Sequence, residues 1–238
     1  MISRYAGGER GARSAARAGS VLVAVDAFRA STTVALLVSR GVRVIPVSSI
    51  REAAAVRADL RIGERASEKV AGFDFGNSPT EISAARLPVG GTAAMSTTNG
   101  TRIIEAGLGA AAIYTGAFVN AGCLASELHT RFPDSEIVVV GCGWEGRRAS
   151  EDESAAGALI HRLGLLGSEL DPRARRVEEI YLRRPFSSLW KNSAARRLLR
   201  LGHEDDIELC LRQDSIPAAP RLLDGKFTQH KDEPPEPA

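Results

Sequence analysis

The chain has 238 residues, of which 44% are apolar and 25% are charged, a composition typical of a soluble globular protein rather than a disordered one. Its 31 Lys and Arg residues nearly balance 29 Asp and Glu residues, for a net charge of +2, which argues against a surface dedicated to nucleic acids. The three cysteines are widely spaced, so we expect neither disulfides nor a structural zinc site. No apolar run reaches the roughly 18 residues of a membrane span or resembles a secretory signal. We therefore expect a cytoplasmic protein without membrane contact.

The predicted elements begin after residues 1–19, a stretch rich in Gly, Ala and Arg that is expected to form a loose or partly helical lead-in. A single α/β domain is expected over residues 20–228, followed by a disordered tail at 229–238. Apolar and β-branched runs predict strands at 21–25, 42–47, 61–62, 92–95, 111–114 and 137–141. Helical patterns alternate with these strands, at 31–40, 51–60, 80–85, 101–106, 119–131 and 151–165. The charged C-terminal part predicts helices at 196–201 and 203–212 and an edge strand at 218–223.

Strands that alternate with helices predict a mostly parallel sheet covered by helices on both faces. In open sheets of this kind, ligands bind outside the carboxyl ends of the strands. The polar loops that follow the predicted strands emerge at that edge, so their residues can converge on one site.

Three of these loops have the composition of an oxyanion site. The most informative is 97–102, which supplies hydroxyls, an amide, a glycine and a guanidinium where a strand passes into a helix. Backbone N–H groups at a helix start favour anions, Gly100 allows close approach, and Arg102 can bind phosphate or carboxylate oxygens in bidentate fashion. Loops 26–33 and 74–81 have the same character. The candidate anion clamps are Arg29 and Arg102, and the candidate substrate-binding residues are Thr32, Thr33, Asn77, Ser78, Thr97, Thr98, Asn99, Gly100 and Thr101.

Several separate motifs, in the right order over about residues 20–225, resemble those of the 2-phosphosulfolactate phosphatase family. They are 25–33, Gly63-Glu64-Arg65, 73–79, 97–102, Asn120-Ala121 and Glu151-Asp152. The resemblance implies an α/β/α sandwich with Mg²⁺ as cofactor, which hydrolyses the phosphate monoester of a small carboxylated sulfonate or hydroxy acid and is associated with coenzyme M biosynthesis. The chain departs from the family at Ala27-Phe28, a minor change, and at Cys142-Gly143-Trp144, where a smaller pair is expected and Trp144 can reshape the pocket.

Such a phosphatase needs carboxylates to hold Mg²⁺, which prefers carboxylate and water oxygens. The candidate metal ligands at strand ends are Asp26, Glu64, Asp74, Glu151 and Asp152. Asp26 is the first choice, as metal ligand or as nucleophile, with helix capping as its structural alternative. The acids at 151 and 152 lie in the first turn of a predicted helix, where the helix dipole favours acids whatever the function.

The other candidates also have structural alternatives. Arg29 and Arg102 can pair with a structural carboxylate such as Glu105 instead of a ligand. The run Asn77-Ser78-Pro79 can be a turn that starts a helix. Most threonines at strand–helix junctions act as caps, so about two of the five are expected to touch a ligand.

Two further mechanisms and a second function stay open at this point. Phe28 stands where phosphatases with an aspartyl nucleophile carry a second acid, which disfavours that mechanism. Cys142 and Arg148 have the Cys-x₅-Arg spacing of thiolate phosphatases, although Glu145 places a negative charge inside that loop. A noncatalytic anion-binding or regulatory homologue is the alternative function, and the charged C-terminal helices allow a homodimer.

Overall fold

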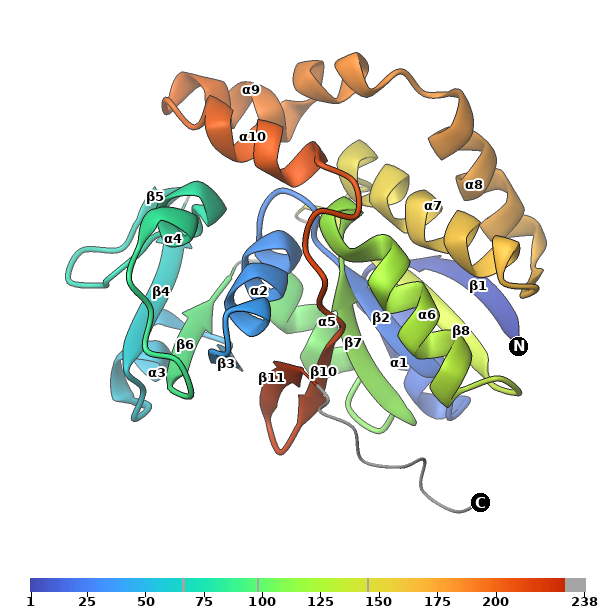
Figure 1. Cartoon of the computed structure of the whole chain (residues 1–238), viewed down its shortest axis with the longest axis horizontal. Helices are drawn as coiled ribbons and strands as arrows, with labels where there is room; N and C mark the ends of the chain where they lie inside the picture. Colours follow the sequence, from blue (N-terminus) through green and yellow to red (C-terminus); the bar gives the residue numbers. More distant parts are fainter. Residues whose placement is uncertain (66, 98, 145, 230–238) are drawn as a thin grey trace.

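The structure, a computed structural model, describes residues 1–65, 67–97, 99–144 and 146–229 (Figure 1). It is a three-layer α/β/α sandwich whose strands, in this part of the chain, follow the order β5-β4-β6-β3-β11-β10-β7-β2-β8-β1-β9. Most neighbouring strands are parallel, and the antiparallel pairs involve β5, β10 and β11. The α/β fold class predicted from the sequence is therefore confirmed.

The strands are β1 (Ile2–Gly7), β2 (Val21–Val25), β3 (Arg43–Val47), β4 (Leu60–Arg65), β5 (Glu68–Lys69), β6 (Thr92–Ser96), β7 (Ala112–Gly116), β8 (Glu136–Gly141), β9 (Glu169–Leu170), β10 (Pro220–Leu223) and β11 (Lys226–Gln229). The α-helices are α1 (Gly8–Arg17), α2 (Ala30–Ser39), α3 (Ile50–Ala55), α4 (Pro79–Ala84), α5 (Gly100–Ala106), α6 (Ala121–Arg131), α7 (Ser150–Leu165), α8 (Pro172–Arg183), α9 (Ser193–Arg200) and α10 (Glu204–Leu211). Short 3₁₀ helices occupy Phe118–Asn120 and Phe186–Lys191.

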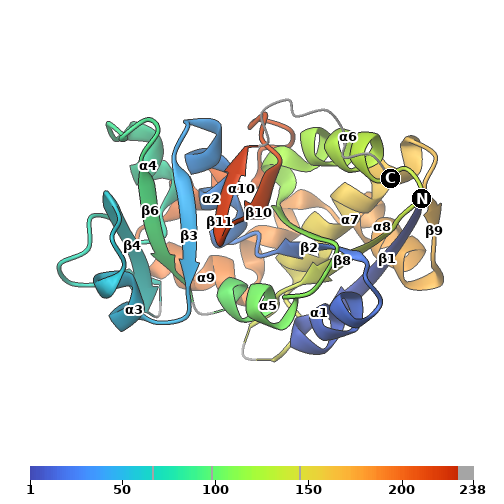
Figure 2. The ribbon, with the colours of Figure 1, turned by 90° about the horizontal axis from the view of Figure 1, so that it is seen from below.

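Strand β2 shows how the two faces of the sheet are covered. All five of its residues are buried, because the side chains alternate between two apolar cores. The odd-numbered valines, such as Val23, pack in the core formed with α6, α7 and α8. Leu22 and Ala24 belong to the other core, which includes Ala12 of α1 and Ile103 of α5. Figure 2 shows α1 and α5 together on one face of the sheet.

The strands β10 and β11 form a hairpin that is inserted in the middle of the sheet. Strand β10 shares one residue pair, Arg221 with Tyr114, with β7, and β11 shares one, Phe227 with Val44, with β3. The predicted strand at 218–223 is thus present, but its assignment to the edge is wrong. Local sequence cannot reveal this position, because it depends on pairing with strands far away in the chain.

The N-terminal stretch 1–19 also differs from its prediction. Part of it is helical, in α1, but residues 2–7 are not a loose lead-in, since β1 pairs with both β8 and β9. Its sequence lacks an apolar run, and its buried Ser3 donates to or accepts from Ser168 at 2.8 Å. The predicted helix at 51–60 is too long, because Leu60 already belongs to β4. The predicted tail at 229–238 begins one residue too early, because Gln229 belongs to β11. Residues 230–238 lie outside the described residues, so their disorder stays a prediction.

The C-terminal helices lie over the carboxyl ends of the parallel strands. Figure 1 shows α9 and α10 above the loops that follow β2 and β4, with α8 leading toward them along α7. Helix α10 packs against α4 and α9. This arrangement covers the edge of the sheet where the sequence predicts a site.

Candidate active site

A cavity of about 260 Å³ opens at this edge, under α9. It is lined by Asp26, Phe28, Arg29, Glu64, Arg65, Ser67, Asn77, Thr97, Asn99, Trp144 and Arg197. The lining residues come from the end of β4, from the loops after β2, β4, β6 and β8, and from α9. The polar loops therefore converge, as the parallel sheet predicts.

Asp26 is the first residue after β2 and lies between the starts of two helices. Its backbone N–H donates to Ser31 Oγ at 2.8 Å, and the backbone N–H groups of Ala30 and Gly100 face its carboxylate and favour its charged form. Burial, followed by the negative charges of Glu64 and Glu151, raises the pKa of Asp26 from 3.8 to about 7. The N–H groups at the starts of α2 and α5 thus stabilise this carboxylate.

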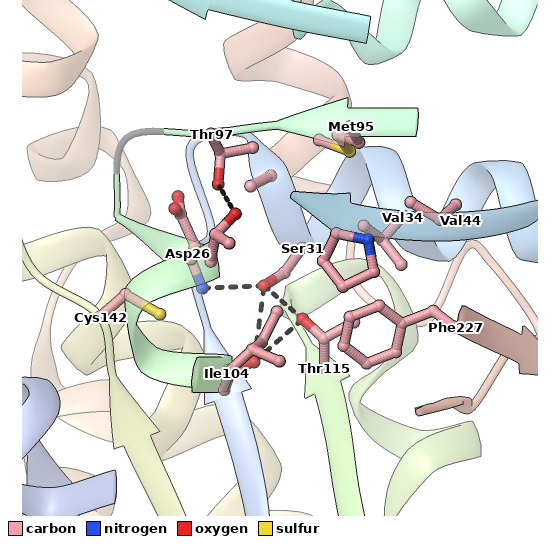
Figure 3. Close-up of a pocket in the computed structure, with 15 residues that line it drawn as sticks. Asp26, Ser31, Val34, Val44, Met95, Thr97, Ile104, Thr115, Cys142 and Phe227 are labelled. Carbon is pink, nitrogen blue, oxygen red and sulfur yellow. Dashed lines mark hydrogen bonds between the residues drawn. The ribbon is translucent and has the colours of Figure 1, made fainter. Parts of the chain in front are cut away.

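A second, small apolar cavity of about 30 Å³ lies beside Asp26 (Figure 3). It shares Asp26 and Thr97 with the main cavity. In its wall, the hydroxyls of Ser31 and Thr115 are 2.8 Å apart, and Thr115 Oγ1 donates to Ala24 O at 3.1 Å. This chain of hydrogen bonds fixes the backbone at the end of β2.

The acidic candidates separate into groups. Glu64 lines the main cavity with Asp26, and its Oε2 accepts the N–H of Ser67 at 2.6 Å. Glu151 is buried nearby and accepts from Asn192 Nδ2 at 2.9 Å, and burial raises its pKa. Asp26 and Glu64 therefore share one cavity, with Glu151 close to them, and their role as metal ligands stays a prediction.

Asp152 and Asp74 have mainly structural contacts. The carboxylate of Asp152 accepts the N–H groups of Ala27 and Gly143, each at 2.8 Å, and so ties the loop after β2 to the loop after β8. Burial, and then the charge of Asp26, raises its pKa well above the ordinary value. Asp74 is exposed, accepts the N–H of Arg61 at 2.7 Å, and is absent from the described lining of the cavity.

Asn77 has the most informative polar side chain in the cavity wall. It is 5% exposed, and its Oδ1 has no hydrogen-bond partner among the described residues. A buried amide oxygen without a partner is costly unless a ligand, a cation or water satisfies it. Asn99 also lines the cavity and is half-buried.

The remaining candidates in the 26–33 and 74–81 loops make contacts within the protein. Ser78 caps α4 and donates to Asp206 Oδ1 at 2.8 Å. Thr32 donates to Ala27 O at 3.1 Å, and Thr33 is fully buried. None of these three lines the main cavity in the described part of the chain.

The 97–102 loop contributes to both cavities. Thr97 lies on both, and its hydroxyl is 3.4 Å from that of Thr101, which lines the small one with Gly100. Thr98 lies outside the described residues. Arg102 is exposed on α5 and is not among the described residues that line the main cavity, so its role as an anion clamp stays a prediction.

Arg29 has a structural partner that the sequence did not suggest. Its NH1 donates to Asp206 Oδ2 at 2.6 Å and its NH2 to Ser67 O at 3.1 Å. Arg29 and Asp206 are 3% and 1% exposed. The structural alternative weighed for Arg29, pairing with a carboxylate, is therefore observed, with Asp206 and not Glu105 as the partner. Asp206 also accepts from Thr80 N at 3.0 Å. Contact of Arg29 with a substrate oxygen stays a prediction.

Several residues of the site come from the C-terminal helices and were missed. Asp206 lies beside Glu204 and Asp205 in the first turn of α10, where three acids look like ordinary helix-start residues. Arg197 lies on α9 among other arginines. No local signal separates either residue from its neighbours, because their importance depends on contacts with distant loops.

The environment of Cys142 opposes a thiolate mechanism. The residue is buried, and burial, followed by the charges of Asp26 and Asp152, raises its pKa well above 9.0. A nucleophilic cysteine needs the opposite, a positive environment that lowers the pKa of the thiol. The thiol therefore stays protonated near neutral pH.

The raised pKa of Asp26 leads to a prediction on stability. A carboxyl group whose pKa is higher in the folded state stabilises that state fully below pH 3.8, and this contribution is lost as the pH rises through about 7. In metal-free protein, the free energy of unfolding of Asp26→Asn relative to wild type should therefore increase between about pH 4 and about pH 7. Urea unfolding in the presence of a chelator measures it. The exposed Asp134→Asn is the control, and an equal pH trend in both variants would contradict the prediction.

Within the described residues, no three His, Cys, Asp or Glu side chains are arranged to hold a metal ion by themselves. Mg²⁺ in phosphate-processing sites commonly takes one or two carboxylates, with water and phosphate oxygens completing its coordination. Asp26, Glu64 and the unpartnered amide oxygen of Asn77 fit that requirement. No helix in the described part is long and apolar enough to cross a lipid bilayer.

The sequence of the chain is similar to those of known proteins over most of its length. A family model for 2-phosphosulpholactate phosphatase matches residues 9–225. A protein of Gloeobacter violaceus named probable 2-phosphosulfolactate phosphatase is 36% identical over 206 residues, which cover 84% of this chain and 86% of the relative. Proteins of the same name from Thermosynechococcus vestitus and Thermotoga maritima are 36% and 35% identical over 221 and 211 residues, each covering 86% of this chain and 90% of the relative. The match covers most of the chain, including the loops that form the cavity, and the chain belongs to the 2-phosphosulfolactate phosphatase family of phosphoric monoester hydrolases.

Proposed function

We propose that the protein hydrolyses 2-phosphosulfolactate to sulfolactate and inorganic phosphate, with Mg²⁺ as cofactor. The observation that carries the proposal is one cavity, in a chain of this family, that holds two carboxylates and a buried amide without a partner. The reaction breaks the ester bond between phosphorus and the substrate oxygen and forms a bond from phosphorus to a water oxygen. A cytoplasmic location and a homodimer stay predictions from the sequence.

Each of these cavity residues has a proposed role. Asp26, Glu64 and Asn77 are the groups that would hold Mg²⁺, which supplies charge neutralisation at the phosphoryl oxygens when bound. We assign Asp26 to the metal and not to a covalent intermediate, because Phe28 stands where phosphatases with an aspartyl nucleophile carry the second acid. Asn99 and Thr97 line the same wall and can donate to phosphoryl oxygens.

Arg29 supports the cavity from behind. Its guanidinium joins the loop after β2 to Asp206 of α10 and to the backbone of Ser67. This contact keeps the cover of C-terminal helices in place over the cavity. Water is thereby kept from part of the site, which strengthens electrostatic interactions within it.

The test is phosphate release by the purified protein from 2-phosphosulfolactate and from a panel of phosphorylated hydroxy acids. We expect a chelator to lower the rate about 100-fold or more, and added Mg²⁺ to restore it. Absence of turnover on every substrate would overturn the proposal. Tight anion binding that is independent of Mg²⁺, without turnover, would instead support a noncatalytic homologue.

A further inference from the structure

Arg197 and Trp144 form the part of the cavity wall that faces the C-terminal helices. The guanidinium carbon of Arg197 lies 5.1 Å from the centroid of the Trp144 ring, within the range of cation–π contact. Arg197 Nε donates to Ser67 Oγ at 2.9 Å. Two contacts therefore orient the guanidinium: the face of the Trp144 ring and the hydrogen bond from Nε to Ser67 Oγ.

These contacts leave the ends of the guanidinium for a ligand. In the part of the chain that the structure describes, the hydrogen bonding of Arg197 involves Nε, and its two terminal nitrogens have no partner. The side chain is half-buried and lines the cavity. A planar fork held at one edge, with its other nitrogens in a cavity, suits a carboxylate or sulfonate.

The helix that carries Arg197 is itself fixed to the acidic side of the site. Asn192 Oδ1 caps α9 by accepting the N–H of Ala195 at 2.7 Å, and Asn192 Nδ2 donates to Glu151. Ala195 and Leu198 bury the other side of α9 against α10. Arg197 is thus presented to the cavity by an anchored helix and not by a free loop.

The charged residues of the cavity wall come from different parts of the fold. Asp26 follows β2, and Glu64 lies in β4 next to Arg65, whose NH1 donates to Glu64 O at 2.7 Å. Arg197 comes from α9, and Arg29 is already paired with Asp206. A phosphoryl group bound through Mg²⁺ would use the acidic residues. A second anionic group on the same substrate then meets the guanidinium of Arg197.

We propose that Arg197 binds the non-phosphoryl anionic group of the substrate, a carboxylate or sulfonate, and that Trp144 positions its guanidinium. This inference rests on the proposed function, because it names the residue that contacts the sulfolactate part of the proposed substrate. It selects phosphate monoesters that carry a second acidic group over simple phosphate esters. Arg197 is a substrate-binding residue and Trp144 a positioning residue.

The test measures binding of two separate probes to the full-length protein by calorimetry. Sulfolactate probes the contact with Arg197, and inorganic phosphate with Mg²⁺ probes the acidic side. Arg197→Gln should weaken sulfolactate binding about 10- to 100-fold, the value of a charge-assisted contact, and change phosphate binding less than about threefold. Arg200→Gln, exposed on the same helix, should change neither.

Arg197→Lys keeps the apolar stem and the charge but not the fork, and should recover part of the affinity for sulfolactate. Equal losses for both probes, no loss for sulfolactate, or no sulfolactate binding by the wild type would each overturn the proposal. The assay of phosphate release is separate. A wild type that binds sulfolactate through Arg197 but releases no phosphate would overturn the proposed function and leave this inference standing.

Discussion

Replacing Asp26 by asparagine is expected to lower kcat for phosphate release by about a thousandfold, since the change removes a charge that would hold the metal beside the reacting phosphoryl group. The fold should persist, because asparagine has nearly the same size and shape as aspartate and its side-chain oxygen can still face the N–H groups of Ala30 and Gly100. Single-turnover phosphate release gives the rate, and circular dichroism with thermal unfolding verifies the fold.

Asp74→Asn is the matched control for this variant. Asp74 was also a candidate metal ligand in the sequence, but it is exposed and is absent from the described lining of the cavity. Its variant should retain activity within about twofold, since surface substitutions away from a site have small effects. Activity of Asp26→Asn close to that of wild type would remove Asp26 from the reaction. A full loss of activity in Asp74→Asn would instead contradict the placement of Asp74 outside the site.

The second large effect is expected on stability, from the buried pair of Arg29 and Asp206. Asp206→Ala leaves a buried guanidinium without its partner and takes the acceptor from Ser78 and Thr80. The free energy of unfolding should fall by about 3–5 kcal/mol, the usual cost of breaking a buried ion pair from one side. Urea unfolding gives the value from the shift in midpoint.

Two further variants separate the ion pair from a simple loss of packing. The double variant Arg29→Met/Asp206→Leu should recover much of the loss, because two apolar side chains leave no buried charge unpaired. Glu208→Gln breaks the exposed pair with Arg212 and should cost less than about 1 kcal/mol. If Asp206→Ala costs no more than this surface variant, the buried pair does not stabilise the fold.

The sequence predicted the central strands and the helices around them because their signals are local. The run of Val21–Val25 is apolar throughout and can only be a buried element. Strands β1 and β11 lack such runs and form by pairing with strands that lie far away in the chain. Their local sequence therefore does not predict them. The position of β10 inside the sheet follows from the same long-range pairing.

The candidate site was predictable to the extent that strand ends define it. Asp26, Glu64, Asn77 and Thr97 share one cavity because parallel strands bring their loops to one edge. The sequence could not indicate that Asp206 neutralises Arg29, since the two residues are 177 positions apart. It also gave no sign that Arg197 and Trp144 form a wall together, because that wall depends on how the C-terminal helices fold back.

The hairpin of β10 and β11 is made late in translation but occupies the middle of the sheet. Its two strands leave the ribosome after all the other described strands, yet they lie between β3 and β7 and join the two parts of the sheet. Until they emerge, a nascent chain has two unpaired strand edges facing each other, and exposed edges of this kind invite wrong pairing. Completion of the catalytic edge during translation therefore waits for residues that contribute no side chain to the main cavity among those described.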